Sequence, residues 1–186
     1  MISNLTTLEE AVISSNTGAD AIKRAPIVDE DTGVRCLRIG DVSNKKPYSE
    51  WGFTSADDKV IEKFSLKRDD IIIARTGNTI GVVKYIDKDT NSVYNNGLIR
   101  LKIDKSKFYP KYIYYNLASK SFKDFVLAIS GGTSTQPNMK IKHTLKFEIR
   151  NCTLEEQKVI AKILSDLDKK IEVNNQINDN FVKLIA

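Results

Sequence analysis

The sequence has few of the residues on which most protein metal sites and disulfide frameworks depend. Its 186 residues include one histidine, His143, and two cysteines, Cys36 and Cys152, which lie far apart in the chain. A histidine-rich metal site and a mechanism that needs a histidine pair are therefore excluded. A disulfide framework or a cysteine zinc site is not expected either. Two isolated thiols fit a reducing cytosol, so we expect a cytoplasmic protein without a bound metal or cofactor.

Long apolar runs are also missing. No stretch approaches the ~20 apolar residues that a membrane-spanning helix needs, and the first residues lack the basic start and apolar core of a signal peptide. We therefore expect no membrane association. What is present is a balance of 41% hydrophobic and 28% charged residues, which is typical of a folded globular protein. The length suits about one domain, long enough to bury a sizeable core.

The motifs of common enzymes are absent as well. The sequence contains no Gly-x-Ser-x-Gly, no phosphate-binding P-loop, no Gly-x-Gly-x-x-Gly and no Asn/Asp-Pro-Pro-Tyr motif of an adenine methyltransferase. The carboxylates at 57–58 are expected in a loop and Asp168 on a long helix, where they cannot share a catalytic metal. We therefore expect a non-catalytic protein that has neither catalytic residues nor metal ligands of its own.

Positive charge is concentrated in one part of the chain. Lysine and arginine number 29 and aspartate and glutamate 24, which gives a net charge of +5. Residues 100–150 carry 11 basic and 3 acidic side chains, whereas residues 1–99 carry 13 and 15 and residues 151–186 carry 5 and 6. A basic middle segment of this kind permits a nucleic-acid partner but does not require one.

Hydrophobic patterning predicts an α+β domain over residues 1–150, with a mixed, mostly antiparallel sheet and flanking helices. Strands are predicted where apolar or β-branched residues run or alternate, at 34–42, 70–75, 80–86, 98–103 and 145–149. The second and third of these flank a glycine turn and predict a hairpin. Capping and helical spacing predict helices after Thr7, after Pro110 and over 119–129. Residues 43–58 and 130–138 have loop composition.

The C-terminal segment, residues 151–186, predicts one long helix. Thr153 and Glu156 have capping-box spacing, and neither proline nor glycine follows them. Apolar residues recur with the heptad spacing of a coiled coil. The predicted pairing stripe consists of Ile160, Ile163, Leu164, Leu167, Ile171, Asn174, Ile177, Phe181 and Leu184. No second long helix is predicted in the chain, so the stripe is expected to pair with another chain. Asn174 either fixes the register of that pairing or marks where the stripe turns to solvent.

Several polar segments suit contact with duplex DNA. Lysine and arginine bind phosphates, and arginine, asparagine and glutamine can hydrogen-bond base edges. The base-reading candidates are Arg75, Asn78, Asn95 and Gln136, and the phosphate-binding candidates are Lys45, Lys46, Lys84, Arg100, Lys140 and Lys142. Each segment also has a purely structural alternative. The segments around Asn78 and at 130–138 can be ordinary turns, and Tyr48 and Trp51 can pack into the core.

Several stretches together resemble one half of a type I restriction-modification specificity (S) subunit. Residues 37–42 (Leu-Arg-Ile-Gly-Asp-Val) and 66–77 resemble two early segments of that family, with Asp69 where glycine is usual. Residues 131–138 (Gly-Gly-Thr-Ser-Thr-Gln-Pro-Asn) resemble its Gly-Thr-x-Gln-Pro-Asn loop. Residues 154–161 and 167–171 resemble the start of its long helix, although the preceding Asn-Cys-Thr lacks the prolines that are usual there.

The resemblance implies a target recognition domain that reads one half of a bipartite DNA site, followed by a spacer helix. Complete S subunits carry two such domains and two antiparallel helices. This chain shows one of each, so its helix is expected to pair with a second copy or with a different half subunit. The family also recruits methyltransferase (M) and restriction (R) subunits, which supply the catalysis. The residues alone leave two alternatives: an adaptor that binds only protein through the long helix, and a small nuclease.

Overall fold

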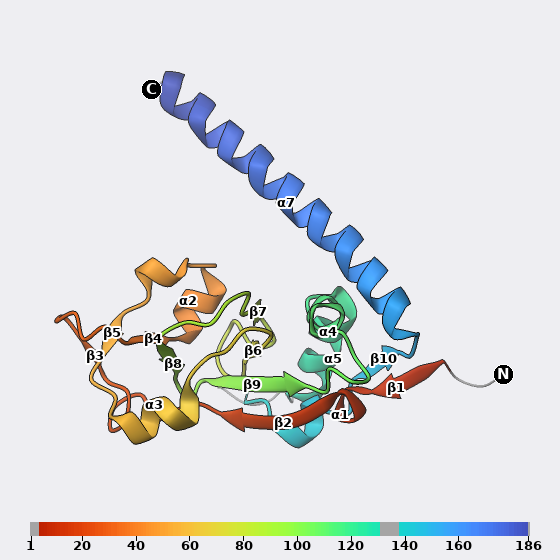
Figure 1. Ribbon diagram of the computed structural model, residues 1–186, viewed down its shortest axis with the longest axis horizontal. Coiled ribbons are helices and arrows are strands. Elements are labelled where there is room, and N and C mark those ends of the chain that lie inside the picture. Colours follow the sequence, from red (N-terminus) through yellow and green to blue (C-terminus); the bar gives the residue numbers. More distant parts are fainter. Residues whose placement is uncertain (1–3, 131–137, 186) are drawn as a thin grey trace.

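Four antiparallel strands form the central sheet of the computed structural model, which describes residues 4–130 and 138–185 (Figure 1). Their order is β2 (Val12–Thr17), β9 (Leu98–Ile103), β6 (Ile71–Ala74) and β7 (Val83–Tyr85). A second sheet has the order β3 (Ile27–Val28), β5 (Phe53–Thr54), β4 (Arg35–Leu37) and β8 (Ser92–Tyr94), and its β4–β8 pair is parallel. A third sheet pairs β1 (Leu5–Thr7) with β10 (Glu148–Arg150). The α+β class with mostly antiparallel pairing is confirmed, but three sheets replace the single predicted one.

The helices lie on two sides of the central sheet (Figure 1). On one side, residues of α1 (Leu8–Ala11), α4 (Pro110–Leu117) and α5 (Lys120–Ile129) join a common hydrophobic core, close to α6 (Ile141–Thr144). On the other side, α2 (Ile39–Ser43), the 3-10 turn η1 (Tyr48–Glu50) and α3 (Asp58–Phe64) surround a second core together with the second sheet. The central sheet therefore separates two hydrophobic cores.

Alternation along the central strands explains why both cores exist. Successive side chains of a strand point to opposite faces of the sheet. In β6, Ile71 and Ile73 belong to the first core, and Ile72 and Ala74 belong to the second. All four side chains are fully buried. Such a continuous apolar run is what a strand covered on both faces requires.

Two predicted strands are shorter in the structure than in the sequence analysis. The strand predicted at 34–42 ends at Leu37, and α2 follows because the Asp41 carboxylate accepts a hydrogen bond of 2.9 Å from the backbone N–H of Arg38. The hairpin of β6 and β7 is confirmed. Residues 80–82, however, belong to its turn, in which the N–H of Gly81 donates to the carbonyl of Ala74 at 2.8 Å.

Three other boundaries also differ from the prediction. The helix after Thr7 is a single turn, because the β-branched segment that follows pairs with β9 as β2. Residues 57–58 are not in a loop: Asp57 caps α3 and accepts a 2.8 Å hydrogen bond from the N–H of Val60. The strand predicted at 145–149 begins only at Glu148. The helices predicted after Pro110 and over 119–129 are confirmed as α4 and α5.

The long C-terminal helix is confirmed as α7 (Leu154–Ile185), which projects from the rest of the chain (Figure 1). At 1.5 Å per residue it is about 48 Å long. The predicted capping box is present: Glu156 accepts from the N–H of Thr153 at 2.8 Å, and Thr153 Oγ1 accepts from the N–H of Glu156 at 3.3 Å. Within the described part of the chain, no helix is both long and apolar enough to cross a membrane.

Only the first turns of α7 are packed against the rest of the chain. Gln157, Ala161 and Ser165 are buried, whereas every side chain from Asp166 to Val182 is exposed. Ala161 belongs to the first hydrophobic core, which also contains residues of β6 and α4. The base of α7 thus shares a core with the sheet, and the division of the chain at residue 150 stays a prediction.

Candidate nucleic-acid interface

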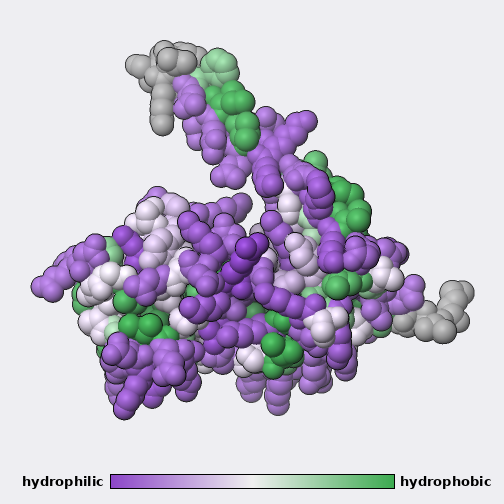
Figure 2. Space-filling view, in the orientation of Figure 1, coloured by the Kyte–Doolittle hydropathy of each residue, from purple (hydrophilic) through white to green (hydrophobic). Residues whose placement is uncertain are grey.

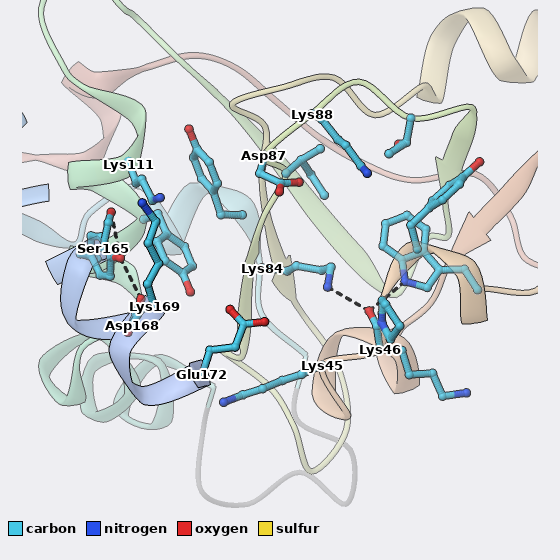
Figure 3. Close-up of a pocket in the computed structure, with 18 residues that line it drawn as sticks. Lys45, Lys46, Lys84, Asp87, Lys88, Lys111, Ser165, Asp168, Lys169 and Glu172 are labelled. Carbon is cyan, nitrogen blue, oxygen red and sulfur yellow. Dashed lines mark hydrogen bonds between the residues drawn. The ribbon is translucent and has the colours of Figure 1, made fainter. Parts of the chain in front are cut away.

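A cleft of about 590 Å³ lies between the base of α7 and the segment that follows α2. Figure 3 shows lysine side chains entering it from both walls. We call it the lysine cleft, because its lining contains six lysines and only three carboxylates. The lysines are Lys45, Lys46, Lys84, Lys88, Lys111 and Lys169, and the carboxylates are Asp87, Asp168 and Glu172. The remaining lining includes the rings of Tyr48, Trp51, Tyr85, Tyr114 and Tyr115. Clustered cations with aromatic surface between them suit a polyanion that also has flat apolar parts.

Lys45 is held in the cleft by an unusual backbone conformation. Its φ is +53°, in the left-handed region that glycine prefers. The N–H of Lys46 donates to the carbonyl of Asp41 at 2.9 Å, and the N–H of Lys45 donates to the carbonyl of Val42 at 3.2 Å. This pair of bonds is a Schellman motif, in which Lys45 occupies the position where glycine is most common. The structure therefore keeps a charged side chain at a strained position that faces the cleft.

Lys84 and Lys46 are joined through a single backbone carbonyl. The carbonyl of Lys46 accepts hydrogen bonds from Lys84 Nζ and from Trp51 Nε1, each at 3.2 Å. Lys84 Nζ also lies 5.6 Å from the centre of the Trp51 ring. Burial lowers the pKa of Lys84, because it disfavours the charged amine. Trp51 is 2% exposed, so the alternative that it packs into the core is correct, and Tyr48 packs edge-on against it at 5.3 Å.

The opposite wall of the cleft is formed by α4 and α7. The Tyr115 hydroxyl of α4 donates to Asp168 Oδ2 of α7 at 2.7 Å and lies 3.2 Å from Ser165 Oγ. Burial, together with the neighbouring Asp168 carboxylate, raises the pKa of Tyr115 to about 12. Beside it, Lys111 Nζ lies 5.6 Å from the centre of the Tyr85 ring. These contacts attach α7 to the rest of the chain at the cleft itself.

A second group of polar residues lies on three loops that hydrogen bonds of Arg75 join. We call it the polar cluster: Arg75, Asn96 and Asn138, together with Asn78 and Asn95, which are close to them in the chain. Arg75 donates to Asn138 Oδ1 at 2.8 Å and to the carbonyl of Asn96 at 3.3 Å. Asn78 is exposed three residues beyond Arg75, in the turn between β6 and β7. Arg75 Nε and Asn95 Oδ1 are buried without a hydrogen-bond partner in the described parts of the chain. Six buried side-chain polar atoms among the described residues have no partner, and two of them belong to this cluster. Unpaired buried polar atoms are rare in folded proteins, and a bound ligand is one explanation for them.

The short helix α2 connects the two groups. At its start, Ile39 packs onto Gly97, where a Cβ would lie 2.5 Å from Ile39 Cδ1, so a larger residue at 97 would require Ile39 to move. The N–H of Arg75 donates to the carbonyl of the same Gly97 at 3.0 Å. At the other end of α2, Lys45 lines the lysine cleft. The helix α2 therefore has one end next to the turn that carries Asn95 and Asn96 and the other end next to the cleft.

The structure brings together most of the predicted DNA-contacting residues. Lys45, Lys46 and Lys84 line the cleft, and Arg75, Asn78 and Asn95 belong to the polar cluster. Lys140 and Lys142 are exposed on or beside α6, next to Asn138 in the chain. Gln136 lies outside the described residues. Sequence reasoning missed Lys88, Lys111, Lys169, Asn96 and Asn138. Of these residues, only Asn138 could have been found from the sequence, because it is the last residue of the segment that resembles the Gly-Thr-x-Gln-Pro-Asn loop.

Arg100 is wrong as a phosphate-binding candidate. Its side chain is buried, with 6% of the residue exposed. Its NH1 donates to the carbonyl of Ser65 at 2.7 Å and lies 3.9 Å from the carboxylate of Asp70, which is also buried. Burial raises the pKa of Asp70, while the backbone N–H of Lys67 and the positive charge of Arg100 oppose that rise. Arg100 is thus an internal residue of the second core.

The outer side of α7 carries exposed apolar residues, which Figure 2 shows as a band turned away from the rest of the chain. We call these residues the outer stripe: Val159, Ile163, Leu167, Ile171, Ile177 and Phe181, which are 46–59% exposed. Of the predicted pairing residues, Ile160 instead packs partly against the first core, Leu164 is half-buried and Asn174 is exposed. The side chain of Leu184 lies outside the described residues. Exposed apolar residues gathered along one side of a helix are typical of an interaction surface.

Comparison with known families connects this fold to one of them. A family model described as "Type I restriction modification DNA specificity domain" matches residues 28–180. The MjaVIII type I restriction enzyme specificity subunit of Methanocaldococcus jannaschii is 27% identical over 161 residues, which are 82% of this chain and 37% of that protein. The MjaIX specificity subunit of the same organism is 31% identical over 102 residues, 55% of this chain and 23% of that protein. This chain therefore spans well under half the length of these relatives.

Solved structures share the fold. The type I restriction-modification S subunit of M. genitalium superimposes with a TM-score of 0.63 and 22% identity over 90% of this chain and 39% of its own. The HsdS subunit of Thermoanaerobacter tengcongensis superimposes with a TM-score of 0.66 and 10% identity over 93% of this chain and 44% of its own. The family model covers most of the sequence, including strands β6, β7 and β9 of the central sheet and most of α7. This chain belongs to the type I restriction modification DNA specificity domain family.

Proposed function

We propose that the chain recognises one half of a bipartite duplex DNA site, as a non-catalytic specificity component of a type I restriction-modification system. The observation that carries the proposal is the polar cluster. Hydrogen bonds join Arg75, Asn96 and Asn138 from three loops, and Asn78 and Asn95 lie close to these residues in the chain. Arg75 and Asn95 each have one unpaired buried polar atom among the described residues. Arginine pairs with guanine and asparagine with adenine in the major groove, so such a cluster has the chemistry of base reading.

In this proposal the lysine cleft holds the DNA backbone while the polar cluster reads bases. Phosphate contacts fix the position of a protein on the duplex and base contacts supply sequence preference. Lys45 and Lys84 enter the cleft from one wall, with Lys46 at its edge beside Asp41, and Lys111 and Lys169 line the other wall. Lys140 and Lys142 extend the positive charge beside Asn138. Because α2 reaches from one group to the other, we expect both groups to contact the same segment of duplex.

The first test measures binding to DNA selected from a random duplex pool. Lys46→Glu with Lys88→Glu, and separately Lys140→Glu with Lys142→Glu, should weaken binding to every sequence and reduce the dependence of affinity on salt. The matched control is Lys59→Glu, an exposed lysine of α3 that does not line the cleft. An unchanged salt slope in either double variant would remove that lysine pair from the interface.

Base reading is tested at Arg75. Arg75→Ala should relax the preference at one or two base pairs and cost ~1–3 kcal/mol of discrimination there, while the salt slope changes little. The readout is the base frequency at each position of the selected DNA. A variant that keeps the parental base preferences would show that Arg75 only supports the loop through Asn138. Retention of no particular sequence by the parent chain would favour the alternative of an adaptor that binds protein alone.

We also propose that the outer stripe pairs with the same stripe of a second copy, with the two helices antiparallel. The stripe is nearly symmetric about residue 170: Val159 and Phe181 lie equally far from it, as do Ile163 and Ile177. An antiparallel pair would therefore place apolar residues opposite apolar residues along most of α7. A different half subunit with a similar stripe could take the same place.

Sedimentation tests the pairing. Ile163→Asp, Leu167→Asp and Ile177→Asp together should convert the protein to monomers, because charges would face each other in an apolar seam. The matched control is Asn175→Asp with Gln176→Asp, two exposed residues of α7 that line the cleft side instead. A dimer that persists in the triple variant would refute pairing through this stripe.

Recruitment of the methyltransferase and restriction subunits is proposed from membership of the family, and those subunits would supply the chemistry. No group of three histidine, cysteine, aspartate or glutamate residues in the described parts of the chain could hold a metal ion. The nuclease alternative predicts metal-dependent cleavage by the chain alone. Incubating the purified chain with its selected DNA and Mg²⁺ tests that alternative, and intact DNA would remove it.

A further inference from the structure

The direction in which α7 leaves the rest of the chain depends on two groups of polar contacts, one buried and one partly exposed. The first surrounds Gln157, whose side chain lies in the protein interior and is 1% exposed. Its Oε1 accepts from the N–H of Tyr109 at 2.8 Å, and its Nε2 donates to the carbonyls of Lys107 at 3.3 Å and Cys152 at 2.9 Å. One amide therefore ties the start of α7 to the loop that leads into α4.

The second group lies about three turns further along α7. The Tyr115 hydroxyl contacts Asp168 at 2.7 Å and Ser165 at 3.2 Å, and Ser165 donates in turn to the carbonyl of Ala161 at 2.6 Å. Gln157 and Asp168 are separated by roughly 16 Å at 1.5 Å per residue. Ala161 packs into the first core between these two points, nearer to Gln157, so without the contact at Asp168 the helix would be held only by its first two turns.

Beyond Asp168 the helix has no further support within the described residues, since every side chain from Lys169 to Val182 is exposed. If contact at Asp168 loosened by about 2 Å, α7 would rotate around Gln157 by roughly 7°, and its axis at Val182 would move roughly 4–5 Å. One base-pair step of DNA is about 3.4 Å. A small change at Tyr115 would thus displace the far end of α7 by more than one base pair.

We propose that Gln157 and Tyr115 are positioning residues that fix the angle of α7 and thereby set the number of base pairs between the two half-sites. This inference rests on the function proposed above, because the gap has meaning only if two copies read one bipartite site. Neither residue belongs to the polar cluster. Substituting either one should therefore change the tolerated gap and leave the preferred bases unchanged.

The angle itself can be measured without DNA. Spin labels on Ser49→Cys and Asn180→Cys, both at exposed positions, report the distance from the cleft wall to the far end of α7 in a Cys152→Ser background. Labelled chains are mixed with a tenfold excess of unlabelled chains, so that distances within one chain dominate. Tyr115→Phe removes a single oxygen and should at least double the width of the distance distribution. Tyr114→Phe is the matched control, because its hydroxyl has no hydrogen bond to a described residue.

Gln157→Ala should broaden the same distribution, and a width unchanged in both Gln157→Ala and Tyr115→Phe would overturn the proposal. Selection from a duplex pool with two random half-sites and variable gaps then tests the link to DNA. The parent should select one gap, and Tyr115→Phe should accept gaps one base pair shorter and longer with the same half-site bases. A single gap kept by a variant whose α7 has loosened would overturn the link to spacing. If the parent selects no bipartite site at all, the proposed function fails, whereas the angle measurement still decides the role of the two residues.

Discussion

Replacing Lys45 with glycine should stabilise the fold and weaken DNA binding at the same time. Lys45 has a φ of +53° in the Schellman motif that ends α2. A left-handed conformation costs a residue with a side chain ~1–2 kcal/mol. Glycine avoids that cost but loses ~0.5–1 kcal/mol through its greater freedom in the unfolded chain. The net gain is about 0.5–1 kcal/mol, which for a protein of this size raises Tm by ~1–4 °C.

The same substitution removes one lysine from the cleft. Loss of one phosphate contact should reduce the slope of log affinity against log salt by ~0.9. Thermal unfolding followed by circular dichroism measures the first effect, and fluorescence anisotropy with a labelled duplex at several salt concentrations measures the second. The two effects have opposite signs, which few substitutions produce by general disruption of the fold.

Lys45→Ala separates the two causes. Alanine removes the charge but keeps the backbone penalty, so it should weaken DNA binding as glycine does without raising Tm. A lower Tm for Lys45→Gly than for Lys45→Ala would refute the argument from backbone strain. A salt slope that neither variant changes would show that Lys45 occupies the strained position without contacting DNA.

Two further substitutions or measurements test the buried groups. Arg100→Met should lower the free energy of unfolding by ~3–5 kcal/mol in urea titrations at pH 7, because it leaves the buried Asp70 carboxylate without its cationic partner. The control Lys102→Met should change the free energy of unfolding by less than ~0.5 kcal/mol. Since burial raises the pKa of Asp70, the stability lost in Arg100→Met should shrink as the pH falls through that raised pKa and the carboxyl becomes neutral. A loss of stability that does not depend on pH would contradict the pairing of Arg100 with Asp70. Burial also raises the pKa of the Cys36 thiol to about 11. At pH 8 a thiol reagent should therefore label Cys152 first and Cys36 only after unfolding. Equal labelling rates of the two thiols in the folded protein would disprove the burial of Cys36.

Local sequence patterns predicted the helices and strands whose apolar side chains pack against one neighbouring surface. The alternation in Leu98–Ile103 identified β9, and the spacing of Phe122 and Val126 identified α5. The same alternation does not reveal that Arg100 is buried, because a strand face that carries charged residues is normally expected to face solvent. Arg100 shares its face with Leu98, and the second core covers that face. A pattern of period two separates the faces of a strand but does not say what packs on each.

The lysine cleft shows why charge along the chain is a poor guide to charge in space. Residues 1–99 have slightly more acidic than basic residues. Nevertheless Lys45, Lys46, Lys84 and Lys88 from this segment form much of the cleft, whereas Lys111 alone comes from the basic middle segment. The folding of β7 beside the end of α2 brings these lysines together, and no local sequence signal records that contact. The polar cluster depends in the same way on three loops that are distant in sequence.

The two sides of the long helix α7 differ in how well the sequence predicts them. Positions two apart on a helix point about 200° away from each other. Val159 and Ile163 of the outer stripe therefore face away from Gln157, Ala161 and Ser165, which hold the helix to the rest of the chain. The heptad pattern found most of the outer side because an apolar stripe has a recognisable period, although it also included Ile160 and Leu164, which are partly buried. The inner side was missed because Gln157 and Ser165 are polar, and a buried polar contact is specified by its partner rather than by its period. A partner chain bound to the outer stripe would consequently leave Gln157 and Tyr115 undisturbed, so that α7 can join two copies and keep its angle to each of them.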